Sequence, residues 1–318
     1  MTTGALPTWG VVMQVKAPLA MVQTFVAWHL ELGADWIAVY FDDPDDPAAP
    51  ALDGMDRLKV FRCGDKHWTK IKGMRPDLKT VRQICNSQHA YRRSKVDWLA
   101  HIDVDEFLWP MRPEGDTAPW NQVMGGLLAA VPAEQMFLRL RPHEALIDPD
   151  GGPPVHFRAP LRGQNRGAAV RDFYGHYAAA MNNGMLSHSV GKAISRTGIP
   201  GFQPRLHAPR IQGKKLPGTD FCDEIALLHF HATDIDDWLR QVDYRARLGA
   251  YSGRDETRIF YQSATTEDLV AFHHAVQAAK PALVAKLAAS NMLLTADPRL
   301  EEARVRVFGS GKPGATSR

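Results

Sequence analysis

The chain has 318 residues, of which 45% are hydrophobic and 23% charged, and its formal net charge is +3. This composition is that of an ordinary globular protein, and so small a charge gives no argument for a nucleic-acid or membrane partner. The three widely spaced cysteines exclude a disulfide framework and favour a reducing compartment. Because no signal peptide is evident and no apolar stretch reaches membrane-spanning length, we expect a soluble, cytoplasmic protein without a transmembrane segment.

The first 41 residues predict a strand, a helix and a second strand. The short apolar runs at 9–15 and 36–41 are typical of buried strands. Between them, apolar side chains recur at helical spacing after Pro18, and Gly33 follows the last turn. His29 lies on the apolar stripe of this helix, and we interpret it as a hydrogen-bonded core residue. The pattern indicates a βαβ unit, and with it the parallel sheet of an α/β protein.

A third strand is predicted at 58–61, followed by a helix at 77–94. One side of this helix is formed by Leu78, Val81, Cys85 and Gln88. The segment 57–95 carries twelve lysines and arginines against two aspartates. Such an excess of cations suits a diphosphate or a sugar nucleotide. A solvated helix face is one alternative, and nucleic-acid binding is another, weakened by the few aromatic residues in the segment.

An apolar run at 98–102 ends in the acidic sequence Asp103-Val104-Asp105-Glu106. Side chains at i and i+2 of an extended segment point the same way, so we expect Asp103 and Asp105 to converge at the end of a strand. Two neighbouring carboxylates need a cation between them. Oxygen ligands suit Mg²⁺ or Mn²⁺, shared with a substrate diphosphate. The alternative interpretation is an acidic turn in solvent.

Two further acids, Asp42 and Asp43, follow the second predicted strand. Open α/β sheets bind their ligands outside the carboxyl ends of the strands. Both acidic pairs occupy this position, which predicts a ligand site at this edge of the sheet. The chain has no serine elbow, P-loop or dinucleotide fingerprint, and this disfavours serine-elbow hydrolases, P-loop NTPases and NAD-dependent dehydrogenases.

The middle of the chain is harder to interpret. Residues 148–220 are rich in glycine and proline, with a short strand at 192–195, and we expect a loop-rich lid or acceptor platform. The apolar run at 225–231 predicts another strand, with His229 and His231 on one face. For these two histidines, metal ligation and a structural role in the core are equally good interpretations.

Two helices are predicted after this strand, at 234–248 and 266–289. We therefore expect one domain at 1–232 and a helical extension at 233–308. The remaining segment, 309–318, is rich in glycine, serine and proline, and we expect it to be disordered.

Three blocks of residues together match one family of enzymes. The blocks are 11–16 with 25–35 and 39–43, then 82–83 with 97–99 and 103–108, and finally 228–231 with 238–239. On these residues the chain resembles the family 2-like glycosyltransferases of GT-A fold, in the bacterial branch called glycosyl transferase family 2. The resemblance implies a GT-A-like (Rossmann-like), mostly parallel sheet flanked by helices.

The resemblance also implies an activity, a cofactor and partners. The activity is metal-dependent glycosyl transfer from a nucleotide-sugar donor, in the first place a UDP-sugar, to a glycan or lipid-linked acceptor. Asp103 and Asp105 match the family's D-x-D motif, which holds Mn²⁺ or Mg²⁺ against the donor diphosphate, where the ion acts as a Lewis acid. His229 or His231 matches a late histidine that completes the metal shell.

Five residues match the family's donor pocket. Asp42 or Asp43 matches the acid that meets the base or ribose, and Lys16 borders the same pocket. Arg82 and Gln83 match the helix that lines the nucleotide. The chain departs from the family in one place, because the Asn-Glu pair that commonly follows the lysine is absent.

Glycosyl transfer with inversion also requires a base near the acceptor hydroxyl. The candidates are Glu106, Asp220, Asp223 and Glu224. Two other functions stay open. A non-catalytic nucleotide- or glycan-binding protein would bind without turnover, and a Mg²⁺-dependent nucleotidyltransferase would release pyrophosphate.

Overall fold

The computed structural model describes residues 5–113, 115–217, 220–249, 251 and 254–310. The chain forms two compact units. The first unit consists of residues 1–141, 192–227 and 299–318, and the second of residues 142–191 and 228–298. This division does not follow the predicted boundaries, since 142–191 belongs with the later helices. Most of the predicted disordered tail, from 311 on, lies outside the described residues.

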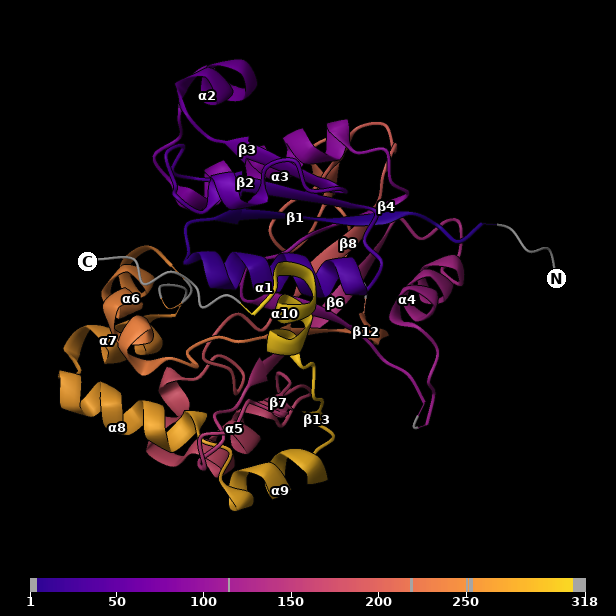
Figure 1. Ribbon diagram of the computed structural model, residues 1–318. Coiled ribbons are helices and arrows are strands. Elements are labelled where there is room, and N and C mark those ends of the chain that lie inside the picture. Colours follow the sequence, from indigo (N-terminus) through magenta and orange to yellow (C-terminus); the bar gives the residue numbers. More distant parts are fainter. Residues whose placement is uncertain (1–4, 114, 218–219, 250, 252–253, 311–318) are drawn as a thin grey trace. The chain divides into compact units, whose positions relative to one another are not determined.

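The first unit is built on a mixed sheet in which four neighbouring strands are parallel. These strands, in the order in which they lie side by side, are β4 (Trp98–His101), β1 (Trp9–Val15), β2 (Trp36–Phe41) and β3 (Leu58–Arg62). β1 is completely buried, as its continuous apolar sequence predicts. The predicted βαβ opening and parallel sheet are therefore confirmed, with helices flanking the sheet (Figure 1).

Antiparallel strands extend this sheet beyond β4. β8 (Lys192–Arg196) pairs with β4, and β6 (Phe137–Ala145) pairs with β8. β5 (Glu106–Pro110) pairs with β12 (Phe221–His229). β8 coincides with the strand predicted at 192–195. The consequence for the site is that Lys192, at the start of β8, lies near the end of β4.

The helices of the first unit are α1 (Leu19–Glu31), α2 (Asp65–Lys72), α3 (Lys79–Arg93), α4 (Trp120–Ala129) and α10 (Leu300–Phe308), with a short 3₁₀ helix, η1 (Ala49–Leu52). α10 returns from the end of the chain to pack against α1 (Figure 1), where Arg306 Nε lies 2.6 Å from Glu31 Oε1. His29 of α1 is fully buried and its Nδ1 lies 2.8 Å from the Phe25 carbonyl oxygen, which confirms its predicted place in the core.

α3 turns a polar face toward the interior. Its buried residues are Gln83, Asn86, Ser87, Ala90 and Tyr91. The side formed by Leu78, Val81, Cys85 and Gln88 is not the buried one, because Leu78 is 54% exposed and the other three residues are only half-buried. Buried amides are costly unless they are hydrogen-bonded. The polar face of α3 therefore requires polar partners beneath it, and these belong to the candidate site described below.

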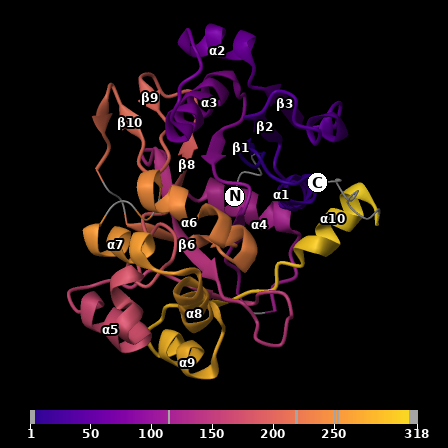
Figure 2. The same cartoon turned by 90° about the vertical axis from the view of Figure 1, so that its left-hand side faces the viewer.

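The second unit is mainly helical. Its elements are β7 (His156–Arg158), α5 (Arg166–Tyr174), η2 (Gly175–Ala180), α6 (Ile235–Leu248), α7 (Asp255–Ser263), α8 (Thr266–Gln277), α9 (Pro281–Ala289) and β13 (Leu293–Thr295). α5, α8 and α9 lie close together in both views (Figures 1 and 2). Its core is apolar and aromatic, and includes Trp238, Tyr261 and Phe272.

The predicted helix at 234–248 is confirmed as α6, whose cap residue Asp234 accepts a hydrogen bond from the Asp237 N–H at 2.8 Å. The predicted single helix at 266–289 is wrong. It is interrupted between α8 and α9, where Ala278 and Lys280 are extended. Pro281 is the cause, since proline disfavours helical backbone at the residue before it and starts a new helix readily.

The predicted loop-rich region, 148–220, is divided between the units. Its first part contains α5 and η2, and its last part contains β8 and a small sheet of β9 (Phe202–Gln203), β10 (Arg210–Ile211) and β11 (Lys214–Lys215). In the part of the chain that the structure describes, no helix is both long and apolar enough to cross a membrane.

Candidate functional site

The carboxyl ends of β1, β2 and β4 meet at one edge of the first unit's sheet. The last residue of β2, Phe41, pairs with Val15, whereas the last residue of β4, His101, pairs with Val12. Measured along β1, β4 therefore ends three residues before β2. The backbone N–H of Asp42 donates to the Val15 carbonyl at 2.9 Å. This register places two acids, Asp42 and Asp103, on either side of the end of β1.

Asp42 is held by two arginines and a glutamine. Arg82 binds both of its carboxylate oxygens, at 2.8 Å from Nε and 2.8 Å from Nη2. Arg75 lies 3.2 Å from Oδ2, and Gln14 of β1 donates to Oδ1 at 3.1 Å. The Asp42 side chain is 13% exposed, whereas Arg75 is 47% exposed. Two guanidinium groups around one carboxylate leave a local positive charge, which suits a phosphate.

Asp103 lies in a tight turn and not at the end of an extended strand. β4 ends at His101, and the Glu106 N–H donates to the Asp103 carbonyl at 3.0 Å. In return, the Asp103 N–H donates to Glu106 Oε2 at 2.8 Å. The premise that Asp103 and Asp105 lie in one extended segment is therefore wrong. The turn instead brings Glu106 back onto Asp103.

Lys192 supplies a cation to this turn. Its ammonium group lies 2.7 Å from Asp103 Oδ2 and 3.3 Å from Glu106 Oε2. Lys192 and Glu106 are buried, while the Asp103 side chain is 33% exposed. Burial alone raises the pKa of Asp103, but the charge and hydrogen bond of Lys192 outweigh burial and hold the pKa well below its usual range. Burial lowers the pKa of Lys192, and the two carboxylates more than reverse that effect.

The polar face of α3 joins the two acids. Gln83 donates to Asp103 Oδ1 at 2.9 Å, and its neighbour Arg82 holds Asp42. One turn later, Asn86 donates to Gln14 Oε1 at 2.8 Å and lies 2.7 Å from His67 Nε2. This network explains why α3 buries amides, and it couples the two acids through one rigid element.

His101, the last residue of β4, precedes this turn. Burial and, to a smaller extent, the charge of Lys192 lower its pKa to about 4, against the opposing effect of Asp103 and Glu106. Neither ring nitrogen has a hydrogen-bond partner among the described residues. His101 is therefore a neutral imidazole in the wall behind the turn.

The remaining predicted residues of the first unit lie in different places. Lys16 is exposed directly after β1. Asp43 accepts the Asp45 N–H at 3.1 Å and so closes a turn after β2. Asp105 is half-buried within the Asp103–Glu106 turn. Asp223 is exposed on β12, where its charge acts on Arg141.

The two predicted histidine ligands belong to the second unit. His229 and His231 are buried, and their ring centroids are 5.2 Å apart. His231 Nε2 lies 2.9 Å from the Tyr251 hydroxyl oxygen and 2.7 Å from a guanidinium nitrogen of Arg245. Burial, together with the Arg245 charge, lowers the pKa of His231 well below its ordinary value. Within its own unit, His231 is thus a neutral, hydrogen-bonded core residue beside a cation.

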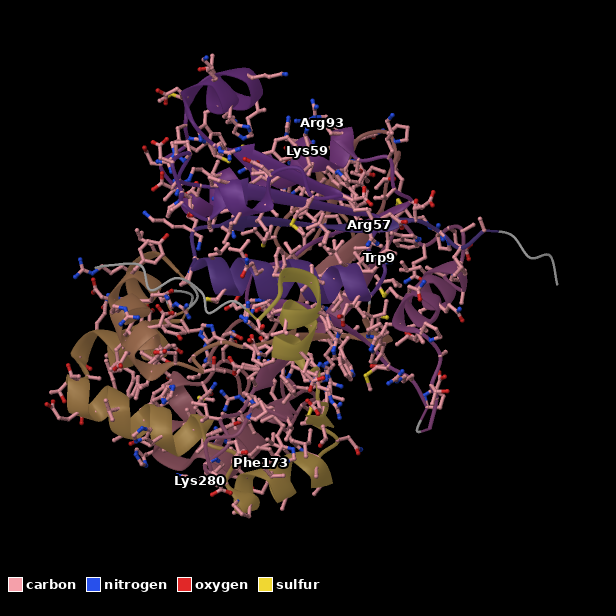
Figure 3. All side chains as sticks on the ribbon, viewed as in Figure 1. Trp9, Arg57, Lys59, Arg93, Phe173 and Lys280 are labelled. Atoms are coloured by element: carbon pink, nitrogen blue, oxygen red, sulfur yellow. The ribbon has the colours of Figure 1, made fainter. Side chains whose placement is uncertain are left out.

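The basic segment 57–95 contributes only part of its charge to this edge. Arg75 and Arg82 contact Asp42, as described above. Arg57 lies just before β3, near Trp9 at the start of β1, and both mark the opposite, amino-terminal edge of the sheet (Figure 3). Lys59 and Arg93, also labelled there, are exposed on β3 and at the end of α3. The solvated-surface interpretation therefore holds for much of the segment.

The sequence did not identify Lys192, Gln14 or Asn86 as site residues, and it included Arg75 only as one of the twelve cations of the segment 57–95. The available signal for Lys192 was a lysine at the start of a predicted strand, directly before the apolar residues Ala193 and Ile194, since such a residue requires a partner when it is buried. Its partner lies 89 positions away in the chain, so the signal could not identify Asp103. Gln14 was a second such signal, as a polar residue inside a completely buried strand.

The oxygen donors of this edge fit a divalent metal only in combination with a substrate. Among the described residues of the first unit, no three histidine, cysteine or carboxylate side chains have ligand atoms close enough to hold an ion by themselves. The turn nevertheless carries three carboxylates, those of Asp103, Asp105 and Glu106, and Lys192 contacts two of them. Mg²⁺ and Mn²⁺ commonly use one or two carboxylates and complete their shell with phosphate oxygens and water.

Comparison with known proteins gives no family: no protein-family model matches the chain, and no curated protein matches it. The structure itself defines an α/β protein with a polar site at the carboxyl edge of its parallel strands.

Proposed function

We propose that the protein is a metal-dependent glycosyltransferase of GT-A-like fold that uses a nucleotide-sugar donor. The observation that carries the proposal is the pair of acids at the carboxyl edge, Asp42 with its arginines and Asp103 with Lys192, joined by α3. Ligands of open α/β sheets bind at this edge, where the strand order reverses. β1 lies at that reversal, because it is followed by β2 on one side and has β4 on the other.

In this proposal Asp42 accepts hydrogen bonds from the ribose or base, and Arg82 fixes its orientation. Arg75 is 47% exposed beside it and pairs with the diphosphate. Gln83 and Lys192 hold Asp103 ionised and in place, as the lowered pKa of Asp103 supports. Lys16 and Asp43 border the same pocket. A UDP-sugar is the first donor to test, and a glycan or lipid-linked molecule is the acceptor.

The metal would be held by Asp105, with Asp103 beside it. Asp105 is half-buried in the same turn as Asp103 and Glu106. When bound, Mn²⁺ or Mg²⁺ would supply Lewis-acid stabilisation of the departing nucleoside diphosphate. Glu106 accepts the Asp103 N–H and contacts Lys192, so it positions the turn. The proposal assigns no base, because Asp223 lies at the other end of β5, where the Met111 N–H donates to the carbonyl of the next residue, Glu224, at 2.8 Å.

A cytoplasmic location forms part of the proposal. Its support is the three cysteines, all of which are free thiols in the structure. Proteins of reducing compartments seldom carry disulfides.

The test is nucleotide binding followed by product analysis. Thermal unfolding is measured with UDP, GDP, CDP and ADP, with and without Mn²⁺, for the wild type, Asp105→Asn and Asp42→Asn. Asp56→Asn is the matched control, because Asp56 is 98% exposed just before β3, at the opposite edge of the sheet. A ligand at a hundred times its Kd stabilises by about 2.7 kcal/mol, which is a shift of a few degrees.

We expect one nucleoside diphosphate to raise the unfolding temperature of the wild type, and only when Mn²⁺ is present. Asp105→Asn and Asp42→Asn should abolish this increase, and Asp56→Asn should not. Incubation with the matching nucleotide sugar should then release that nucleoside diphosphate. Release of pyrophosphate from a nucleoside triphosphate would instead establish a nucleotidyltransferase. Metal-dependent binding without any turnover or donor hydrolysis would establish a binding protein. A shift unaffected by Asp105→Asn and Asp42→Asn would refute the site.

A further inference from the structure

A cavity of about 790 Å³ opens in the second unit and is formed wholly by that unit's residues. Its walls are the first two turns of α5 and the residue Gln164 before them, the 3₁₀ helix η2 with the residues after it, and the start of α7. α5 and α7 both pack against η2. Small-molecule sites have volumes of roughly 300–1,000 Å³, so the cavity has the size of a ligand site and not of a single ion.

Three arginines line this cavity: Arg166 and Arg171 of α5, and Arg254 just before α7. Arg166 donates to the Gly163 carbonyl at 3.4 Å, and Arg254 donates to the Met181 carbonyl. Within the described chain, none of the three guanidinium groups forms a salt bridge with a carboxylate. The lining also includes one acid, Glu256, so the cavity has a net charge of about +2.

The arginines come from two helices that are fixed in place. Thr257 of α7 donates to the Ala179 carbonyl of η2 at 3.0 Å, and Tyr261 donates to the Ala180 carbonyl at 3.4 Å. Thr257 and Tyr261 are buried. The packing of α5 and α7 against η2 therefore brings the backbone positions of the three exposed arginines around one cavity.

The rest of the lining is polar. Asn182 and Asn183 are oriented by hydrogen bonds to Ser187 and Ser189, at 3.1 and 2.9 Å. Gln164, at the beginning of α5, adds a third amide. Amide groups both donate and accept, which matches the hydroxyl groups of a sugar or polyol. Gly167, in the amino-terminal turn of α5, also lines the cavity, and the positive end of the helix dipole at that turn favours an anion.

We propose that this cavity binds a phosphate monoester of a small polyhydroxylated molecule, such as a sugar phosphate. A phosphate monoester carries a charge of about −1.5 to −2 at pH 7, which balances the net charge of the lining. The three amides account for the hydroxyl groups, and the volume accommodates a sugar as well as its phosphate. The proposal is independent of the donor site in the first unit.

The probes are glucose 1-phosphate, inorganic phosphate and glucose, titrated calorimetrically into the full-length protein. EDTA is present throughout, so that metal-dependent binding at the first unit gives no signal. The variants are Arg166→Gln and Arg171→Gln, both on the exposed side of α5. The matched control is Arg258→Gln, since Arg258 lies on α7, is paired with Asp255 at 2.9 Å and does not line the cavity.

We expect glucose 1-phosphate to bind more tightly than inorganic phosphate, and glucose to give no binding. Each of the two α5 variants should weaken glucose 1-phosphate binding by about tenfold or more, because each removes a charge-assisted hydrogen bond, while the control leaves it unchanged. Circular dichroism and thermal unfolding verify that the variants are folded. Absence of binding, or equal binding of glucose and glucose 1-phosphate, refutes the proposal. Arg82→Gln tests whether the ligand binds at the first unit's site instead. Binding that Arg82→Gln weakens and the two α5 variants leave unchanged also refutes the proposal.

Discussion

The two units each contain a buried acid next to a buried base, and the two arrangements differ in their access to solvent. In the second unit, Glu144 and Arg158 are both fully buried and their closest atoms are 2.7 Å apart. Glu144 also accepts the N–H groups of Leu186 and Ser187, each at 2.8 Å. Gln277 accepts from Arg158 at 2.6 Å. This pair is closed, and it joins β7, α8 and the end of β6.

In the first unit, by contrast, Lys192 and Glu106 are buried but Asp103 is 33% exposed and Asp105 is half-buried beside it. The ammonium group of the buried Lys192 thus contacts a carboxylate that solvent reaches. A fully satisfied interior pair has no capacity left for a ligand, whereas a partly exposed one does. The difference suggests that the Glu144–Arg158 pair is structural and that the Asp103–Lys192 pair serves a site.

The largest loss in the free energy of unfolding is expected when the closed pair, Glu144 and Arg158, is broken. Arg158→Met leaves the Glu144 carboxylate buried without its partner, and removal of one partner of a buried pair costs about 3–5 kcal/mol. Urea unfolding at pH 7 measures the loss. The double variant Glu144→Leu with Arg158→Met should recover part of it, because no unpaired charge remains. A loss below about 1 kcal/mol in the single variant would contradict the closed arrangement.

The corresponding change in the open pair is Lys192→Met. We expect a smaller loss of about 2 kcal/mol, since water reaches Asp103 and compensates it in part. Mn²⁺ should restore part of this stability, because a divalent cation replaces the ammonium group between the carboxylates. It should not restore Arg158→Met. If Mn²⁺ changed the free energy of unfolding of the two variants equally, the two pairs would not differ in their access to solvent.

His29 extends the comparison to a buried group without an ionic partner. Burial lowers its pKa from 6.5 to about 3, with a smaller opposing effect from the hydrogen bond to Phe25. At pH 5 the unfolded chain binds a proton that the folded protein does not, so stability falls as pH falls below about 6.5. Between pH 7 and pH 5, this histidine alone lowers the free energy of unfolding by about 2 kcal/mol. His29→Gln should lose that much less over the same interval in urea unfolding, and an unchanged pH dependence would contradict the assignment.

The smallest expected effect on stability is that of Asp105→Asn, which we expect to stay within about 0.5 kcal/mol of the wild type. Asp105 is half-buried in a turn, so loss of its charge leaves the fold intact. The same variant should lose Mn²⁺-dependent nucleotide binding. Paired urea unfolding and thermal-shift measurements separate the two effects. A strongly destabilised variant would place Asp105 among the structural residues.

Much of the fold of the first unit follows from local sequence pattern. The runs 9–15, 36–41 and 58–61 are strands, and the acids after two of them mark the carboxyl edge. Short apolar runs and helical periodicity are local properties, which is why they are predictable. The same reasoning failed at α3, where the buried side is polar, and at Pro281, which divides one predicted helix into two.

By itself, the sequence determined an α/β protein with acids at the ends of parallel strands, and it gave Asp42 and Asp43 at one strand end and Asp103 and Asp105 at another, without separating the members of either pair. Only the tertiary structure decided how these acids are held. Lys192 reaches Asp103 across 89 positions of the chain, and Gln14 meets Asn86 across 72. Such contacts depend on which strands and helices become neighbours, and local spacing carries no information about that choice. The same is true of the arginine-lined cavity, whose walls come from helices more than eighty residues apart, brought together by the core beneath them.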